Sequence, residues 1–162
     1  MVIMGKQEKF TALLENIRSL YNVGSIFRSA DGAGFTQLYL CGFTGYPPRK
    51  EITKTSLGAQ ESVLWQYHKN TQETVDMLQK QGVYMVALEK QATSILLNEA
   101  ISKKLIRTPL CLVVGNEVTG VSPQVLAACD ITVSLSMSGI KESLNVAVAF
   151  GIASYFIKHG LE

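Results

Sequence analysis

Short apolar runs alternate with longer stretches of helical periodicity along this chain. Apolar runs bounded by glycine or polar residues are typical of β-strands, and apolar positions three or four residues apart are typical of helices. The predicted strands are residues 13–17, 37–41, 63–67, 83–88, 110–114 and 131–135. The predicted helices are residues 23–33, 71–81, 122–128 and 144–158. This order predicts an α/β domain with a mainly parallel sheet flanked by helices.

Capping residues indicate where several of the predicted helices begin and end. Gly34 follows the first helix, as is common at helix C-termini. Asn22 is expected to cap the start of the first helix, and Thr71 the start of the second. Ser122 followed by Pro123 predicts the start of the third helix, because proline is favoured at the first helical position.

Ligands of open parallel sheets bind beyond the carboxyl ends of the strands, near the point where the strand order reverses. We therefore expect a ligand at the loops after Leu88, Val114 and Leu135. A different loop, at 42–54, contains glycines and prolines and carries three basic residues, Arg49, Lys50 and Lys54. These are candidate phosphate contacts, although solvated loop charge explains them equally well.

The composition is that of one folded domain. Hydrophobic residues make up 47% of the 162 residues and charged residues only 17%, which excludes a disordered chain. No repeat or flexible linker divides the sequence, so residues 1–162 are expected to form a single domain. The net charge of +2 permits a nucleic-acid partner without requiring one.

The sequence shows no sign of a signal peptide or of a membrane-spanning segment. Residues 1–5 lack the charged start of a signal peptide, and the longest apolar stretch, 144–157, is shorter than the ~20 residues that cross a bilayer. A soluble cytoplasmic protein is expected.

Cys41, Cys111 and Cys129 show no metal-ligand spacing and are expected to be small apolar residues in a reducing compartment. No metal site is predicted.

Several common catalytic signatures are missing from the sequence. It contains no glycine-rich dinucleotide fingerprint, no P-loop and no nucleophile elbow. His68 and His159 are far apart, with no carboxylate or cysteine at a ligand-like offset, so both are expected to have surface or structural roles. The candidate chemistry therefore lies in three polar clusters next to the apolar elements.

The first cluster is the segment from Asn22 to Ala30. Gly24 and Arg28 lie at i and i+4 on one helical face, where a glycine would allow a ligand or another backbone to approach closely. The second cluster, Gly115-Asn116-Glu117 with Gly120, follows a buried strand. It fits a ligand loop and an ordinary turn before a helix equally well.

The third cluster is the segment 137–145. Ser143 and Asn145 are each able to cap the last helix, or to face a ligand. That helix is apolar on nearly every side, as shown by Val148, Phe150 and Ile152. A helix of this kind must be buried in the core or against a second subunit.

Together the clusters resemble the SpoU (TrmH-like) RNA 2′-O-ribose methyltransferases of the SPOUT superfamily. The family's first motif, N-x-G-x-x-x-R, matches Asn22, Gly24 and Arg28. The second, a hydrophobic strand followed by G-N-E-x-x-G, matches residues 113–120. The third, P-M-x-G-x-x-x-S-L-N-V, matches residues 137–146 from its methionine onward. Three motifs in order make the resemblance specific.

The resemblance covers roughly residues 13–158 and implies a fold, a cofactor and a partner. The implied fold has a C-terminal deep trefoil knot, an exception to the rule against knots. The implied cofactor is S-adenosyl-L-methionine, and the implied partners are tRNA or rRNA and a second copy of the chain. No separate RNA-binding extension is expected, and the homodimer would form through the knot region and the last helix.

The resemblance also assigns roles to residues. The implied cofactor contacts are Leu88, Gly115, Asn116, Leu135, Met137, Ser143 and Leu144. The implied catalytic residues are Arg28, Asn22, Glu117, Ser143 and Asn145, with Arg28 of one subunit completing the site of the other. The implied RNA contacts are Arg28, Arg49, Lys50 and Lys54.

The sequence departs from the family pattern at a few positions. Ser136 replaces the usual proline, Ala147 replaces a common second serine, and Tyr155-Phe156 stands where tyrosine-glutamate is frequent. Two other functions are compatible with the same fold: an inactive RNA-binding or assembly factor, and a methyltransferase acting on a base nitrogen. The Asn22, Arg28 and Ser143-Leu144-Asn145 pattern favours the ribose.

Overall fold

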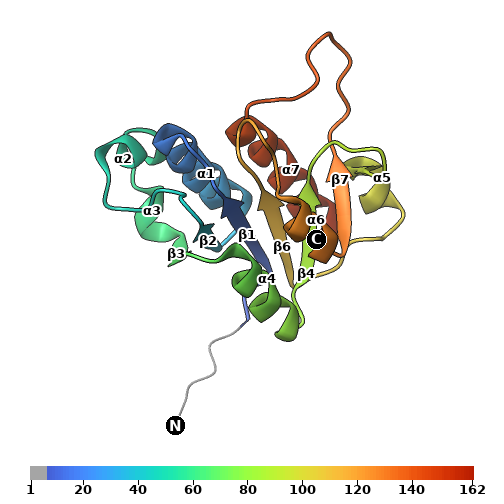
Figure 1. Ribbon diagram of the computed structural model, residues 1–162, viewed down its shortest axis with the longest axis horizontal. Coiled ribbons are helices and arrows are strands. Elements are labelled where there is room, and N and C mark those ends of the chain that lie inside the picture. The colour runs from blue at the N-terminus through green and yellow to red at the C-terminus, as the bar shows by residue number, and fades with distance from the viewer. Residues whose placement is uncertain (1–6) are drawn as a thin grey trace.

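The computed structural model describes residues 7–162, in which seven parallel strands form one sheet with helices on both faces (Figure 1). The strands are β1 (Phe10–Glu15), β2 (Gln37–Cys41), β3 (Leu64–His68), β4 (Tyr84–Leu88), β5 (Ile95–Leu96), β6 (Leu110–Val114) and β7 (Ile131–Ser134). The helices are α1 (Leu20–Ala33), α2 (Lys50–Ser56), α3 (Ala59–Ser62), α4 (Thr71–Lys80), α5 (Leu97–Ser102), α6 (Pro123–Ala128) and α7 (Val146–Leu161). The predicted α/β class with a parallel sheet is confirmed.

The strand order is β3-β2-β1-β6-β4-β7-β5. The chain first builds outward from β1 through β2 to β3, and it then crosses back so that β6 pairs with β1 on its other side. The strand order therefore reverses between β1 and β6. A crevice at the carboxyl ends of these strands is the expected ligand position in such a sheet.

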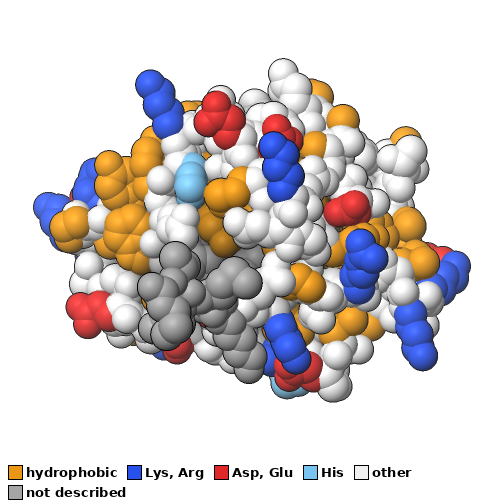
Figure 2. All heavy atoms as spheres, turned by 90° about the horizontal axis from the view of Figure 1, so that it is seen from below, with side chains coloured by type: hydrophobic (Ala, Val, Ile, Leu, Met, Phe, Trp, Pro, Cys, Tyr) orange, Lys and Arg blue, Asp and Glu red, His pale blue; other side chains and the backbone are white. Residues whose placement is uncertain are grey.

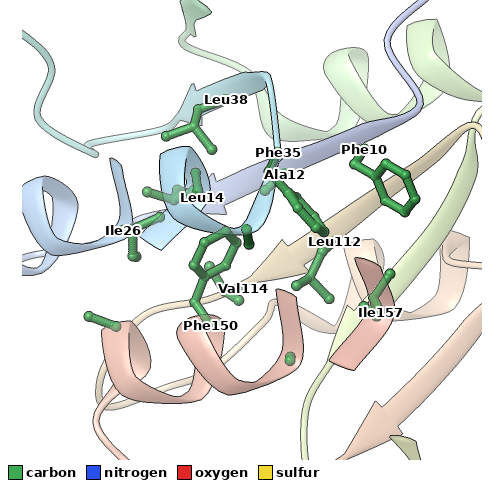
Figure 3. Close-up of a cluster of buried hydrophobic side chains, with 14 of the residues drawn as sticks. Phe10, Ala12, Leu14, Ile26, Phe35, Leu38, Leu112, Val114, Phe150 and Ile157 are labelled. Carbon is green, nitrogen blue, oxygen red and sulfur yellow. The ribbon is translucent and has the colours of Figure 1, made fainter. Parts of the chain in front are cut away.

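Side chains on β1 alternate between two apolar cores, one on each face of the sheet. Ala12 and Leu14 join the core formed with α1 and α7, whereas Leu13 joins the core formed with α4 and α6. Figure 3 shows Leu14, Ile26 and Phe150 pointing into the first core from β1, α1 and α7. A central strand buried on both faces explains why β1 and β6 carry almost no charged residues.

Several predicted boundaries agree with the structure. The strands at 37–41 and 110–114 have the predicted bounds, and Gly34 ends α1 with a left-handed φ of 79°. Ser122 precedes α6, with Pro123 in its first turn. These boundaries were predictable because a local feature defines each of them.

The predicted caps of α1 and α4 were wrong. Ser19 caps α1, and its side chain accepts the backbone N–H of Asn22, which lies inside the helix. Asn70, not Thr71, caps α4 by accepting the N–H of Glu73. Each helix has two suitable polar residues near its start, and the sequence does not distinguish them.

The segment 42–54 was predicted as a loop, but part of it is helical. Lys50 and Lys54 lie on α2, which was missed together with α3 and α5. These helices are short, and none has a side-chain hydrogen bond at its N-cap. Burial of Ile52 against the first core accounts for α2 better than any local signal does.

The remaining expectations concern the chain ends and the surface. The prediction that residues 1–5 are not a signal peptide falls outside the described residues. Within residues 7–162, no helix has the length and apolar character needed to cross a membrane. Figure 2 shows Lys and Arg side chains distributed around the visible face, in keeping with the small net charge.

Candidate ligand and catalytic site

A cavity of about 240 Å³ opens where β4, β6 and β7 end. Its walls come from the loops at 88–90 and 114–120 and from the segment 134–149. All seven residues predicted to contact the cofactor line it: Leu88, Gly115, Asn116, Leu135, Met137, Ser143 and Leu144. The structure thus gathers three separate stretches of sequence around one space, while their contact with a cofactor stays a prediction.

Asn116 shapes the loop after β6. Its Oδ1 accepts the backbone N–H groups of Val118 and Thr119 at 2.9 and 3.0 Å. Its backbone also exchanges two hydrogen bonds with Gly120. A Cβ on Gly115 would lie 2.3 Å from the Gly120 carbonyl carbon, so only glycine allows the loop to close this tightly. Asn116 and Gly115 therefore form the cavity wall by holding the backbone.

Glu117 fastens this loop to the start of α1. Its carboxylate accepts the backbone N–H groups of Arg18 and Ser19 at 2.9 and 3.0 Å, and the side-chain amide of Asn22 at 3.1 Å. Desolvation raises the pKa of Glu117, but these hydrogen bonds outweigh it and hold the pKa below its ordinary value. A carboxylate at a helix N-terminus also interacts favourably with the helix dipole.

Asn145 connects the third cluster to the first. Its Oδ1 accepts the N–H groups of Ala147 and Val148 and so caps α7, which decides between the two expected caps in favour of Asn145. Its Nδ2 donates to Oδ1 of Asn22 at 3.3 Å. Asn145, Asn22 and Glu117 therefore form one continuous network, in which the three predicted motifs meet.

Arg28 and Ser143 stand apart from this network. Arg28 is exposed on α1 and does not line the cavity, and within residues 7–162 its guanidinium makes no hydrogen bond or ion pair. Ser143 lines the cavity as an exposed side chain. The structure of a single chain thus joins Asn22, Glu117 and Asn145 in one network and places Ser143 in the cavity wall. It leaves Arg28 outside both.

The glycine of the first cluster has a clear structural reason. A Cβ on Gly24 would lie 2.3 Å from the carbonyl oxygen of Ile52, so the close neighbour is the backbone of α2 and not a ligand. This contact holds α2 against α1. The exposed basic residues predicted to contact RNA lie along or just before α2: Arg49, Lys50 and Lys54.

Glu89 is a cavity residue that the sequence reasoning missed. Its carboxylate accepts the backbone N–H of Val121 at 2.8 Å and packs against Gly120. It thus ties the loop after β4 to the loop after β6. The available signal was its position directly after a buried strand, at the sheet edge where ligands bind.

The three cysteines are buried or partly buried, which agrees with their expected role as small apolar residues. Cys41 and Cys111 are buried, and Cys129 is partly buried at the end of α6. Burial raises the pKa of Cys41 and Cys129 to about 12 and raises that of Cys111 further. All three thiols therefore stay protonated at neutral pH and are unsuited to nucleophilic chemistry.

The fold and the cavity define a class of protein. Loops after three neighbouring strands, β6, β4 and β7, enclose a site at the carboxyl edge of an open parallel sheet. This is the ligand site of a doubly wound α/β domain. The sequence pattern described as "SpoU rRNA Methylase family" matches residues 9–155, so the chain belongs to the SpoU family.

Curated relatives are RNA 2′-O-methyltransferases by name. The tRNA (guanosine(18)-2′-O)-methyltransferase of Thermus thermophilus is 31% identical, over 93% of this chain and 75% of that protein. The 23S rRNA (guanosine-2′-O-)-methyltransferase RlmB of Vibrio parahaemolyticus is 29% identical, over 88% of this chain and 56% of that protein. The chain thus spans between about half and three quarters of the length of these relatives.

Solved structures share the fold. The AdoMet-bound rRNA methyltransferase from Sinorhizobium meliloti superposes with a TM-score of 0.86 at 27% identity. The match covers 96% of this chain and 58% of that one. The parallel sheet and its flanking helices are therefore shared with that methyltransferase.

Proposed function

We propose that this chain transfers a methyl group from S-adenosyl-L-methionine to a ribose 2′-hydroxyl of tRNA or rRNA. The observation that carries the proposal is the Asn145–Asn22–Glu117 network, which joins three family motifs beside one cavity. The names of the two relatives described above, which specify guanosine 2′-O-methylation of tRNA and of 23S rRNA, support the same reaction.

The cavity fits the cofactor in its chemistry. Leu88, Leu135 and Leu144 provide apolar walls for an adenine ring. Within the described chain, the backbone of residues 136–144 makes no hydrogen bond to another segment. Its N–H and C=O groups are therefore free to bind the polar groups of the cofactor. When bound there, the cofactor supplies a methyl group already activated on a sulfonium.

Arg28 would act on the ribose hydroxyl. A ribose hydroxyl is a poor nucleophile and needs either a base or strong polarisation. A guanidinium has a pKa above about 12 and is a weak candidate for the base. Arg28 would therefore stabilise the developing alkoxide electrostatically, with the hydroxyl proton passing to solvent water. Asn22 and Asn145 would position the ribose-phosphate, and Ser143 would hydrogen-bond it from the cavity wall.

The functional unit would be a homodimer in which Arg28 reaches the cavity of the other subunit. Two observations support this arrangement. Arg28 does not line the cavity of its own chain. One face of α7 leaves Val148, Tyr155 and Phe156 exposed at 50%, 44% and 53%, which is unusual for large apolar residues in a row along a helix. Analytical ultracentrifugation tests the dimer.

The segment from β7 to α7 would be threaded as a deep trefoil knot, as in the SPOUT superfamily. The strand order supports this threading, because β7 lies two strands beyond β6 and the chain then returns, so that α7 packs on α1 and β6. Single-molecule unfolding tests the knot. A knotted chain reaches a shorter extended length than about 3.5 Å per residue predicts.

A methyl-transfer assay tests the reaction itself. Purified protein is incubated with radiolabelled cofactor and total tRNA or rRNA, and the product is digested and analysed by mass spectrometry. A 2′-O-methyl nucleoside is the expected product. A methylated base would show the base-nitrogen reaction, and RNA binding without cofactor binding in calorimetry would show an inactive assembly factor.

A further inference from the structure

Four aromatic side chains gather around the outer strand β3 and the loop that follows β2. They are Phe43, Tyr46, Trp65 and Tyr67, which we call the aromatic surface. The ring of Tyr46 lies 4.5 Å from that of Tyr67 and 5.9 Å from that of Trp65, measured between centroids. Phe43 is 62% exposed and Tyr46 44% exposed. Large rings so open to solvent are typical of binding surfaces.

The aromatic surface is held in place by several hydrogen bonds, of which those of Thr44 are buried. The hydroxyl of Tyr67 donates to the Gly42 carbonyl at 2.6 Å. Thr44, which is 2% exposed, accepts the N–H of Ile17 and donates to β1. The N–H of Phe43 donates to Oδ1 of Asn16 at 3.0 Å. Because the loop is already ordered, a ligand binding here loses little conformational entropy.

The segment that carries the aromatic surface has a net positive charge. Of the 15 Lys and Arg and 13 Asp and Glu in the chain, residues 43–69 hold four basic and two acidic ones, so the rest of the chain holds eleven of each sign. The whole net charge of +2 therefore lies in this segment. Arg49 borders the same hollow as Phe43, Tyr46 and Tyr67. This combination of aromatic rings and cations is typical of proteins that bind single-stranded nucleic acid.

The aromatic surface and the candidate methylation cavity lie at the same edge of the sheet. Asn16, at the end of β1, accepts a hydrogen bond from Asn116 of the cavity wall on one side and from the N–H of Phe43 on the other. With strands spaced about 4.8 Å apart, β3 and β6 end about 15 Å from each other. A few nucleotides of single-stranded RNA cover that distance.

We propose that the aromatic surface stacks unpaired bases of the substrate RNA next to the nucleotide that is methylated. Arg49, Lys50 and Lys54 then contact the phosphates between the stacked bases and the cavity. Bases in a duplex are already paired and stacked, so the substrate is an unpaired loop or end and not a helical stem. This inference rests on the proposed function for its RNA partner, but its binding test does not require methyl transfer.

The only tryptophan of the chain makes a direct test possible. Trp65 belongs to the aromatic surface, so quenching of its fluorescence reports a base that stacks there. The probe is an unstructured RNA of about 12 nucleotides, compared with the same strand in a duplex, without cofactor. We expect the single strand to quench Trp65 and to bind more tightly than the duplex.

Two substitutions at Tyr46 distinguish base stacking on an aromatic ring from contact with any large apolar side chain. We expect Tyr46→Phe to bind the single strand as the unmodified protein does, and Tyr46→Leu to bind it at least about fivefold more weakly. Arg107→Ala, an exposed cation elsewhere on the protein, serves as a charge control that leaves binding unchanged. Thermal unfolding and cofactor calorimetry confirm that both Tyr46 variants keep the fold and the cavity.

Four outcomes would overturn the inference. Equal binding of single strand and duplex, or equal loss with Tyr46→Phe and Tyr46→Leu, would show that no base stacks on the surface. A change of oligomeric state in Tyr46→Leu would assign the surface to contact with a second copy. An active methyltransferase whose Trp65 is not quenched by RNA would reject the aromatic surface and leave the proposed function intact.

Discussion

The side-chain amide of Asn145 donates a 3.3 Å hydrogen bond to the side-chain oxygen of Asn22, although 123 residues separate them in the sequence. Asn145 also caps α7, and Asn22 donates in turn to Glu117. The start of α7, the first turn of α1 and the loop after β6 are thereby held in one arrangement.

Two substitutions at Asn145 separate its capping role from its bond to Asn22. Asn145→Ala removes the acceptor for Ala147 and Val148, so we expect the free energy of unfolding to fall by about 1 kcal/mol. Asn145→Asp keeps the acceptor but cannot donate to Asn22, and it adds negative charge near Glu117. We expect Asn145→Asp to retain most stability and to lose methyl transfer. Urea denaturation and the transfer assay measure both, and full activity of Asn145→Asp would contradict the role of the bond.

Glu117→Gln should weaken the network in a pH-dependent way. The folded-state pKa of Glu117 lies below its ordinary value, so the carboxylate stabilises the fold above that value, and its contribution is lost as the pH falls through the lowered pKa. We expect Glu117→Gln to be less stable than the unmodified protein near neutral pH, with the difference shrinking in acid. Denaturation at a series of pH values measures this difference. A constant difference would show that ionisation of Glu117 is unimportant.

Arg28→Ala should remove activity and leave the fold unchanged. The exposed guanidinium makes no hydrogen bond or ion pair within residues 7–162, so its loss should change the free energy of unfolding by less than about 0.5 kcal/mol. We expect the rate of methyl transfer to fall at least about 100-fold, with the oligomeric state unchanged. Arg107→Ala, which removes an exposed arginine lying 5.1 Å from the Tyr84 ring, controls for the loss of a surface charge. Undiminished transfer by Arg28→Ala would reject its proposed role.

Gly24→Ala tests the close contact between α1 and α2. The added Cβ would lie 2.0 Å from Oγ1 of Thr55 and 2.3 Å from the carbonyl oxygen of Ile52, so the helices must move apart. We expect a loss of about 1–3 kcal/mol in the free energy of unfolding. Gly139→Ala is the control, because nothing lies within 4 Å of a Cβ there. Equal thermal stability of the two variants would show that the contact is not required.

The thiols should react far faster after unfolding than in the native protein. With pKa values of about 12, only about one in ten thousand of the Cys41 and Cys129 thiols is ionised at pH 8. We expect an aromatic disulfide reagent to modify the native protein slowly and the urea-unfolded protein at once. Rapid modification of a native thiol would indicate local opening around α6 or β2.

Much of the fold follows from local sequence. The apolar run at 110–114 and the glycine at Gly34 define a strand and a helix end through their own side chains and backbone preferences. The three cavity loops were also predictable, because the carboxyl ends of parallel strands meet at one edge of the sheet. Motif spacing added the residues of the cavity wall, including Gly115 and Ser143.

Tertiary structure alone decided which partners these residues have. The sequence predicted Asn22 as the cap of α1, and only the packing of α1 shows that Ser19 caps it and that Asn22 binds Glu117 and Asn145 instead. It contained no sign that β6 pairs with β1. The physical reason is that local propensities act over a few residues, whereas the bonds of Asn22 to Glu117 and Asn145 cross 95 and 123 residues of chain and form only once the sheet has assembled.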